Sequence, residues 1–148
     1  MVEEFEKYVN NYDLTKEKVI LKKNHSIRVM NLCVKYAKKL GFNDEDISLA
    51  KVIGLLHDIG RFEQLKEFNS FDDSNIDHAD LGVKILFEEG LIRDFIEEDK
   101  YDYIIKKAIE NHNKYKIEDL KTSEAVYEDG EKIKDGKTLA QKLNWRRL

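Results

Sequence analysis

Apolar residues recur at the spacing of an α-helix along most of the chain. Six segments follow this pattern, at about 5–12, 25–40, 44–56, 77–90, 98–111 and 138–148. None of them shows the strict alternation of apolar and polar residues that is typical of a half-buried strand. The sequence therefore predicts an all-α fold, a compact bundle of about five or six helices.

Residues that flank these segments predict where several helices begin and end. Asn43 and Asp77 each precede an apolar periodic run, where a side-chain oxygen can cap the first turn of a helix. Gly41 and Gly60 follow such runs and are expected to end them. The segment at 44–56 is apolar on nearly all sides, so we expect it to be the central helix.

The helical pattern fades in two places. Between residues 61 and 77 it gives way to a stretch rich in turn-forming residues at 68–75, which predicts a long loop. A loop of this length inside a compact domain is often functional. The pattern also weakens after Tyr115, in a tail that contains glycine and alternating charge.

Composition predicts one domain over residues 1–148, with 41% hydrophobic and 38% charged residues. The net charge of −4 offers no global attraction to nucleic acid or to an anionic membrane, so neither partner is expected. No apolar run approaches the roughly 18 residues of a membrane helix, and the acidic start has no apolar signal core. We therefore expect a cytoplasmic protein, in which the single cysteine, Cys33, is part of the buried core.

The sequence has four histidines, His25, His57, His78 and His112, and each lies at or near the end of a predicted helix. A single histidine in such a place more often caps a helix or lies on the surface. Asp58, however, directly follows the apolar central helix, and a buried carboxylate needs a cation or several donors beside it. Imidazole and carboxylate ligands together suit divalent ions such as Mn, Fe, Co, Ni or Zn.

The segment 54–61 reads GLLHDIGR and resembles the signature of the HD superfamily of metal-dependent phosphohydrolases. His25, in the sequence NHSIRV, is similar to the first histidine of that family. His78 in DHADLG and His112 in IENHNK resemble the third and fourth histidines of the members that bind two metals. The resemblance covers about residues 20–116 and is greatest to a small bacterial branch, so it implies an HD-domain-like bundle.

The resemblance also implies a site and a reaction. His25, His57 and Asp58 would hold one divalent ion, and Asp58, His78 and His112 a second, with Mn, Fe, Co, Ni, Zn or Mg as candidates. Arg61 falls where many relatives have a basic residue that meets the substrate phosphate, although it could instead satisfy a helix end. Asp58 and Arg61 are thus the expected catalytic residues, in hydrolysis of a small-molecule phosphoester for which a nucleotide is the implied class.

One part of the family pattern is missing from the tail. The family's first metal also takes a late aspartate from an apolar helix, but Asp119, Asp129 and Asp135 all lie in polar, poorly patterned surroundings. This predicts that the first metal lacks its fourth ligand, the late carboxylate, and keeps His25, His57 and Asp58. Two alternatives follow, an impaired module that binds metal or nucleotide without turnover, and a structural bundle with four unrelated histidines. The sequence sets neither the substrate, nor the metal, nor the oligomeric state.

Overall fold

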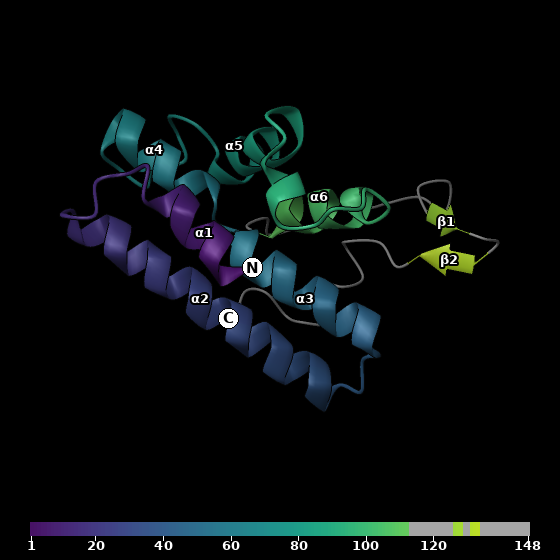
Figure 1. Ribbon diagram of the computed structural model, residues 1–148. Coiled ribbons are helices and arrows are strands. Elements are labelled where there is room, and N and C mark those ends of the chain that lie inside the picture. The colour runs from purple at the N-terminus through teal and green to yellow at the C-terminus, as the bar shows by residue number, and fades with distance from the viewer. Residues whose placement is uncertain (113–125, 129–130, 134–148) are drawn as a thin grey trace.

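The computed structural model describes residues 1–112, 126–128 and 131–133 (Figure 1). Its α-helices are α1 (Val2–Val9), α2 (Glu17–Lys39), α3 (Asp44–Leu56), α4 (Gly60–Phe68), α5 (His78–Val83) and α6 (Asp102–Asn111). A π-helical turn, η1 (Lys84–Glu88), extends α5, and a 3-10 turn, η2 (Leu91–Asp94), follows it. The all-α fold is thereby confirmed. None of the helices in these ranges is long and apolar enough to cross a membrane.

One small element departs from the predicted absence of strands. Val126–Glu128 (β1) and Glu131–Ile133 (β2) pair antiparallel, with Val126 opposite Ile133. Strands of three residues are too short for alternation to be recognised in a sequence. The expected helix at 138–148 lies outside the described residues.

Helices α2 and α3 lie side by side in opposite directions (Figure 1). Gly41, in the left-handed region with φ +74°, ends α2 as predicted. Gly54 of α3 allows a close approach, since a Cβ there would lie 2.9 Å from Cys33 Sγ and 3.0 Å from Met30 Cα. Cys33 is fully buried, and burial raises the pKa of its thiol to about 12. Its expected place in the core is confirmed.

Helix α3 is the central helix, as its apolar composition predicted. Ile53, Leu55 and Leu56 are completely buried. At its start the Asn43 side chain accepts a hydrogen bond from the Asp46 amide at 2.8 Å, which confirms the predicted cap. Its last turn therefore delivers the following residues to the middle of the bundle.

Helix α4 occupies residues where the helical pattern fades and no helix was predicted, and it ends where the predicted loop at 68–75 begins. Phe62 and Leu65 are buried on its inner face, but so is the polar Gln64, which interrupts the apolar periodicity. Gly60, which was predicted to end the helix at 44–56, is instead the first residue of α4, and α3 already ends at Leu56. A Cβ at Gly60 would lie 2.7 Å from the Gly82 nitrogen and closer still to the His78 carbonyl oxygen. The missing side chain lets the start of α4 contact α5.

The start of α5 agrees with the sequence, whereas the start of α2 does not. The Asp77 side chain accepts hydrogen bonds from the Ala79 and Asp80 amides, so the predicted cap is confirmed. Gly90, with φ +85°, follows the π turn at the predicted end of that segment. Helix α2, by contrast, begins at Glu17, eight residues before the expected start. The polar run at 22–24 conceals this first part of the helix.

Helix α1 is part of the same hydrophobic core. Phe5 and Val9 have no exposed surface, and the Phe5 ring meets the Phe62 ring edge-on with centroids 6.0 Å apart. Beyond the helix, the Tyr12 hydroxyl donates a hydrogen bond to Glu63 Oε2 at 2.7 Å. Helix α1 and the residues just after it therefore pack against α4 through one aromatic contact and one hydrogen bond.

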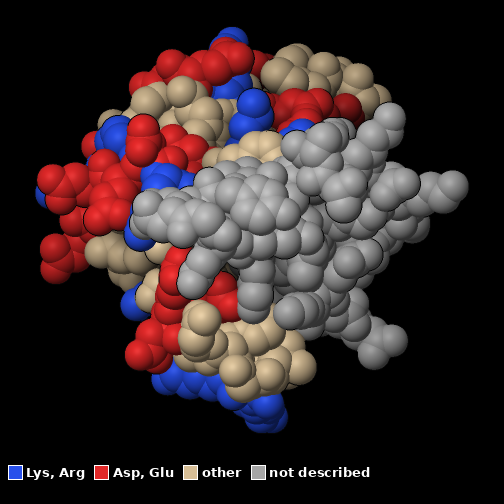
Figure 2. Space-filling view, turned by 90° about the vertical axis from the view of Figure 1, so that its right-hand side faces the viewer, with Lys and Arg blue, Asp and Glu red and all other residues tan. Residues whose placement is uncertain are grey.

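The exterior carries both signs of charge, in keeping with the net charge of −4. Figure 2 shows one face of the molecule, on which Asp and Glu side chains lie in several groups with Lys and Arg side chains among them. Because the net charge is negative, any place where several Lys or Arg side chains lie together is a local feature of the surface and does not follow from the overall charge.

Candidate metal centre

Four histidines from four parts of the chain surround the carboxylate of Asp58. His25 lies in α2, His57 and Asp58 follow the last turn of α3, His78 is the first residue of α5, and His112 follows α6. His57, Asp58 and His78 are buried, with 5%, 5% and 2% of their surface exposed. The structure thus brings together all five predicted ligands. Their role as ligands stays a prediction.

Each carboxylate oxygen of Asp58 faces a different pair of histidines. Oδ2 lies 3.3 Å from the Nε2 atoms of both His25 and His57. Oδ1 lies 3.1 Å from His78 Nε2 and 3.3 Å from His112 Nε2, and these two nitrogens are 3.0 Å apart. The two groups are the two ligand sets implied by the sequence, and the ligand atoms within each lie within 4.8 Å of one another.

These separations fit ligands that share a metal ion. Two atoms that each lie about 2.0–2.2 Å from one cation, at tetrahedral or octahedral angles, stand roughly 3.0–3.5 Å apart. Nitrogen and oxygen atoms at 3.1–3.3 Å around Asp58 agree with that value. The cluster can therefore hold a metal without rearrangement of the backbone.

The protonation states in the cluster also suit a metal. Burial would raise the pKa of Asp58, but the His57 charge and hydrogen bonds from His112, His25 and His57 outweigh it and hold the pKa well below its usual range. Burial lowers the pKa of His112. At neutral pH the carboxylate is ionised and the His112 imidazole is neutral, which are the forms that bind cations. As the pH falls through the lowered pKa of His112, protons will compete with a cation there.

The outer nitrogens of three imidazoles are held by hydrogen-bond acceptors. His57 Nδ1 lies 2.7 Å from the Gly54 carbonyl oxygen, and His112 Nδ1 lies 2.6 Å from that of Ile109. His78 Nδ1 lies 2.9 Å from Asp73 Oδ1. Because these oxygens only accept, each Nδ1 carries a proton, and the Nε2 atom of each ring is the one directed towards Asp58. Once Nε2 has lost its proton, each of these three rings can offer that lone pair to a cation without a change of ring orientation.

His25 differs from the other three histidines. Its Nδ1 atom lies 3.0 Å from the Arg28 guanidinium, which can only donate. In this arrangement the His25 proton lies on Nε2, so the ring must change tautomer, and Arg28 must turn away, before Nε2 binds a metal. The group of His25, His57 and Asp58 is therefore less well prepared for a cation than the group of Asp58, His78 and His112.

The loop between α4 and α5 contributes Asp73, which the sequence did not single out. Gln64 Nε2 donates to Asp73 Oδ1 at 2.9 Å and to the Ile76 carbonyl oxygen at 3.0 Å. Asp73 in turn holds His78, so the buried Gln64 fixes the loop that orients this histidine. Asp73 was one of several acidic residues in a turn-rich stretch. Its position five residues before His78 was the available signal.

Arg61 is also engaged with this loop. Its Nη1 atom donates to the Phe71 carbonyl oxygen at 2.8 Å, to Gln64 Oε1 at 2.9 Å and to Asp73 Oδ1 at 3.3 Å. Its predicted contact with a substrate phosphate remains a prediction. In this structure the Arg61 guanidinium connects α4 to the loop between α4 and α5 through hydrogen bonds.

A second residue that the sequence did not single out is Lys22. Its ammonium lies 3.0 Å from Asp58 Oδ2. Lys22 precedes His25 by three residues on α2, and this helical spacing places both on one face of the helix. That spacing is the signal by which the lysine could have been found.

The contact between Asp73 and His78 leads to a testable prediction. We expect Asp73→Ala to weaken cation binding at the His78 side by about 10–100-fold, because His78 loses the acceptor that sets its tautomer and orientation. The fold should persist, since the Asp73 side chain is 36% exposed. Titration calorimetry with Mn²⁺ or Zn²⁺ measures the change. Asp72→Ala is the matched control, because Asp72 accepts hydrogen bonds within the loop and does not contact His78. Equal losses in both variants would contradict the prediction.

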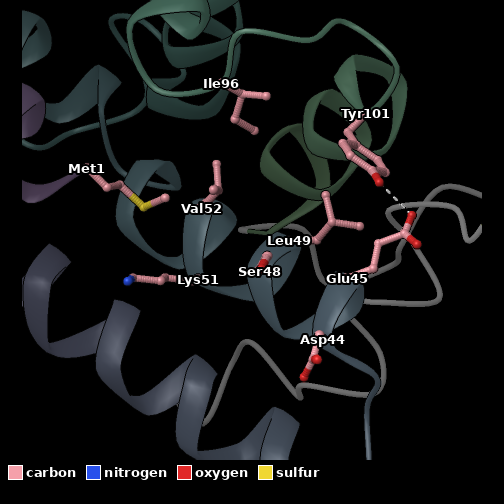
Figure 3. A pocket seen from close by; sticks show the side chains of 9 residues that line it. All are labelled: Met1, Asp44, Glu45, Ser48, Leu49, Lys51, Val52, Ile96 and Tyr101. Atoms are coloured by element: carbon pink, nitrogen blue, oxygen red, sulfur yellow. Dashed lines mark hydrogen bonds between the residues drawn. The ribbon is translucent and has the colours of Figure 1, made fainter.

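A cavity of about 520 Å³ lies elsewhere, beside the first turns of α3 (Figure 3). Leu49, Val52 and Ile96 supply apolar walls, and Tyr101 donates a hydrogen bond to Glu45 at its edge. None of the five predicted ligands lines it. The chemically distinctive site is the cluster around Asp58, not this cavity.

The remaining candidate ligands of the first metal are the late aspartates. Asp119, Asp129 and Asp135 all lie outside the described residues. The prediction that none of them reaches the His25 side therefore stays a prediction.

Comparison with known proteins places the chain in a family. The family model described as "HD domain" matches residues 23–143, which reaches beyond residue 116, where we expected the resemblance to end. Ribonuclease Y 1 of Pediococcus pentosaceus is 44% identical over 62 residues, which are 42% of this chain and 10% of that protein. The chain thus spans about a tenth of the length of this curated relative. No solved structure matches significantly. Because the HD model matches most of its length, the chain belongs to the HD domain family.

Proposed function

We propose that the protein is a metal-dependent phosphohydrolase that acts on a phosphoester. The observation that carries this proposal is the position of Asp58, each of whose oxygens faces its own pair of imidazoles. One carboxylate between two nitrogen pairs is the arrangement needed to bridge two cations. The HD domain is found in metal-dependent phosphohydrolases, so family and geometry support the same chemistry.

The donor set favours some cations over others. Four imidazoles with one carboxylate suit Mn, Fe, Co, Ni or Zn, whereas Mg prefers a shell of oxygen ligands. When bound, a pair of such cations lowers the pKa of a water molecule and neutralises charge on the phosphoryl oxygens. His25, His57 and Asp58 would hold one cation, and Asp58, His78 and His112 the other.

The protein's own contribution is to fix these ligands in place. Asp58 is 5% exposed and ionised, so its charge acts in a poorly hydrated site. Backbone carbonyl oxygens and Asp73 orient three of the four imidazoles before any cation arrives. Such preorganisation lets the site stabilise charge that develops during phosphoester hydrolysis without reorganising its own dipoles.

The substrate class is proposed to be a nucleotide. The family resemblance supports this class, and the name of the Pediococcus relative denotes a ribonuclease, which acts on a chain of nucleotides. A small nucleotide remains our proposal. An RNA oligonucleotide should nevertheless be compared directly with nucleoside mono-, di- and triphosphates.

Removal and return of metal test the proposal. The full chain is stripped with a chelator, reloaded with Mn²⁺, Co²⁺ or Zn²⁺, and assayed for phosphoester hydrolysis on nucleotides and on RNA. We expect turnover in the reloaded protein, none in the stripped protein, and two cations bound per chain. Binding of metal or nucleotide without hydrolysis would favour the impaired module. A chain that binds no metal would overturn the proposal.

A further inference from the structure

Three cationic side chains surround one aromatic ring beside the metal centre. Lys22 Nζ lies 5.3 Å from the centroid of the Phe71 ring, Lys18 Nζ lies 5.9 Å from it, and Arg61 Cζ lies 5.4 Å from it. The two lysines come from successive turns of α2, and Arg61 comes from α4. The faces of an aromatic ring attract cations, so Phe71 keeps positive charge gathered next to Asp58.

These three cations have different partners. Arg61 Nη1 is shared among three acceptors of α4 and the loop, namely Gln64, Phe71 and Asp73. Lys18 is exposed, and its ammonium lies over the Phe71 ring. Lys22 alone of the three reaches the metal centre, with its ammonium 3.0 Å from Asp58 Oδ2.

The position of Lys22 conflicts with a cation on the first group. Asp58 Oδ2 is the oxygen that also faces His25 and His57 at 3.3 Å. A metal held by these three side chains would place a positive charge next to the ammonium, and like charges at such a distance repel strongly in a poorly hydrated site. Lys22 must therefore leave Oδ2 when the first cation binds. With its side chain only 16% exposed, it then stands at the edge of the centre without its anionic partner.

We propose that Lys22 binds the phosphoryl group of the substrate. The inference rests on the proposed function and assigns to Lys22 the phosphate contact that the sequence suggested for Arg61. Without a cation Lys22 neutralises Asp58, and with a cation it turns to a phosphoryl oxygen of the substrate. An ammonium suits this exchange, because it is a compact charge on a flexible stem with three donors and no fixed direction. Arg61 holds the loop instead.

This assignment has a consequence that a purely structural lysine would not show. Removal of the Lys22 charge should strengthen cation binding at the His25 side, because a competitor for Asp58 Oδ2 is lost. The same change should weaken phosphate binding, because a charged donor is lost. A substitution that merely damaged the site would weaken both.

The test compares Lys22→Met, Lys22→Arg and Lys38→Met in the full chain. Lys38 is an exposed residue of the same helix, so Lys38→Met removes an equal charge far from the centre. Calorimetry measures Mn²⁺ binding to the metal-stripped proteins and binding of inorganic phosphate to the Mn²⁺-loaded ones. For Lys22→Met we expect phosphate affinity to fall about tenfold or more, since a charge-assisted hydrogen bond is lost, while Mn²⁺ affinity rises. Lys22→Arg should keep most of the phosphate affinity, and Lys38→Met should match the wild type.

Other outcomes separate this inference from the proposed function. If the wild type binds Mn²⁺ and Lys22→Met keeps full phosphate affinity, or loses affinity for both ligands, the role of Lys22 is wrong and the metal centre stands. If the wild type binds no metal, the proposed function fails and this inference fails with it. Circular dichroism of each variant shows whether its helices are intact. If Lys22→Met does not fold, Lys22→Gln is measured in its place.

Discussion

Asp58→Asn is expected to lose nearly all of its bound metal, with an affinity loss of about 100-fold or more at each group. The substitution keeps the shape of the side chain but removes its charge and one of the two acceptor oxygens that face the histidine pairs. Both groups depend on Asp58, so both lose a ligand at once. Metal analysis of the purified variant and calorimetry measure the loss.

The fold of the Asn variant should survive. Lys22 loses its anionic partner, but its flexible stem and partial exposure let the ammonium find other acceptors at the edge of the site. Asp80→Asn is the matched control, because Asp80 is an exposed acidic residue of α5 close to the site in sequence but not one of the five ligands. An Asn variant that keeps the full metal complement would end the bridging hypothesis.

Gly60→Ala is expected to destabilise the protein by about 3 kcal/mol, the upper end of what overpacking usually costs. The added Cβ would lie 2.7 Å from the Gly82 nitrogen and closer to the His78 carbonyl oxygen. These neighbours are backbone atoms, so relief requires that α4 and α5 move apart. For a domain of this size the Tm should fall by about 10 °C. Because α5 carries His78, cation binding at the His78 side should weaken as well.

Gly90→Ala provides the control for backbone strain. Gly90 has φ +85°, yet a Cβ there would meet nothing within 4 Å. Its substitution should cost only about 1 kcal/mol, from the left-handed conformation, and leave metal binding unchanged. Thermal unfolding of the two metal-stripped variants separates the effects. Equal shifts in Tm would show that close packing at Gly60 is unimportant.

Much of the fold could be predicted because its helices bury apolar stripes and carry capping residues. Asn43 and Asp77 were identified as caps from residue type and position, and the structure confirms both hydrogen-bonding patterns. Helix α4 was missed because its inner face includes the buried Gln64, whose partners lie in the following loop. A polar residue that is satisfied by distant atoms looks like a surface residue in the sequence.

In the candidate site, too, residues with a local sequence signal were predicted, whereas residues whose role depends on tertiary packing were not. Four histidines and Asp58 were identified from the family resemblance and are close together in the structure. Lys22 and Asp73 were not identified, because their roles depend on the path of the loop and on the angle between α2 and α3. Helical spacing places Lys22 near His25, but only the packing brings its ammonium to Asp58.

The position of α1 means that the evolutionary unit and the folding unit of this protein have different limits. The family match starts at residue 23, whereas Phe5 and Val9 of α1 are completely buried against residues of the later helices. The Phe5 ring contacts the Phe62 ring, and just beyond α1 the Tyr12 hydroxyl donates a hydrogen bond to Glu63. Helix α1 therefore covers part of α4, the helix that begins just after Asp58. A fragment chosen by homology alone would leave Phe62 open to water on the side that α1 occupies, in the helix that begins two residues after Asp58.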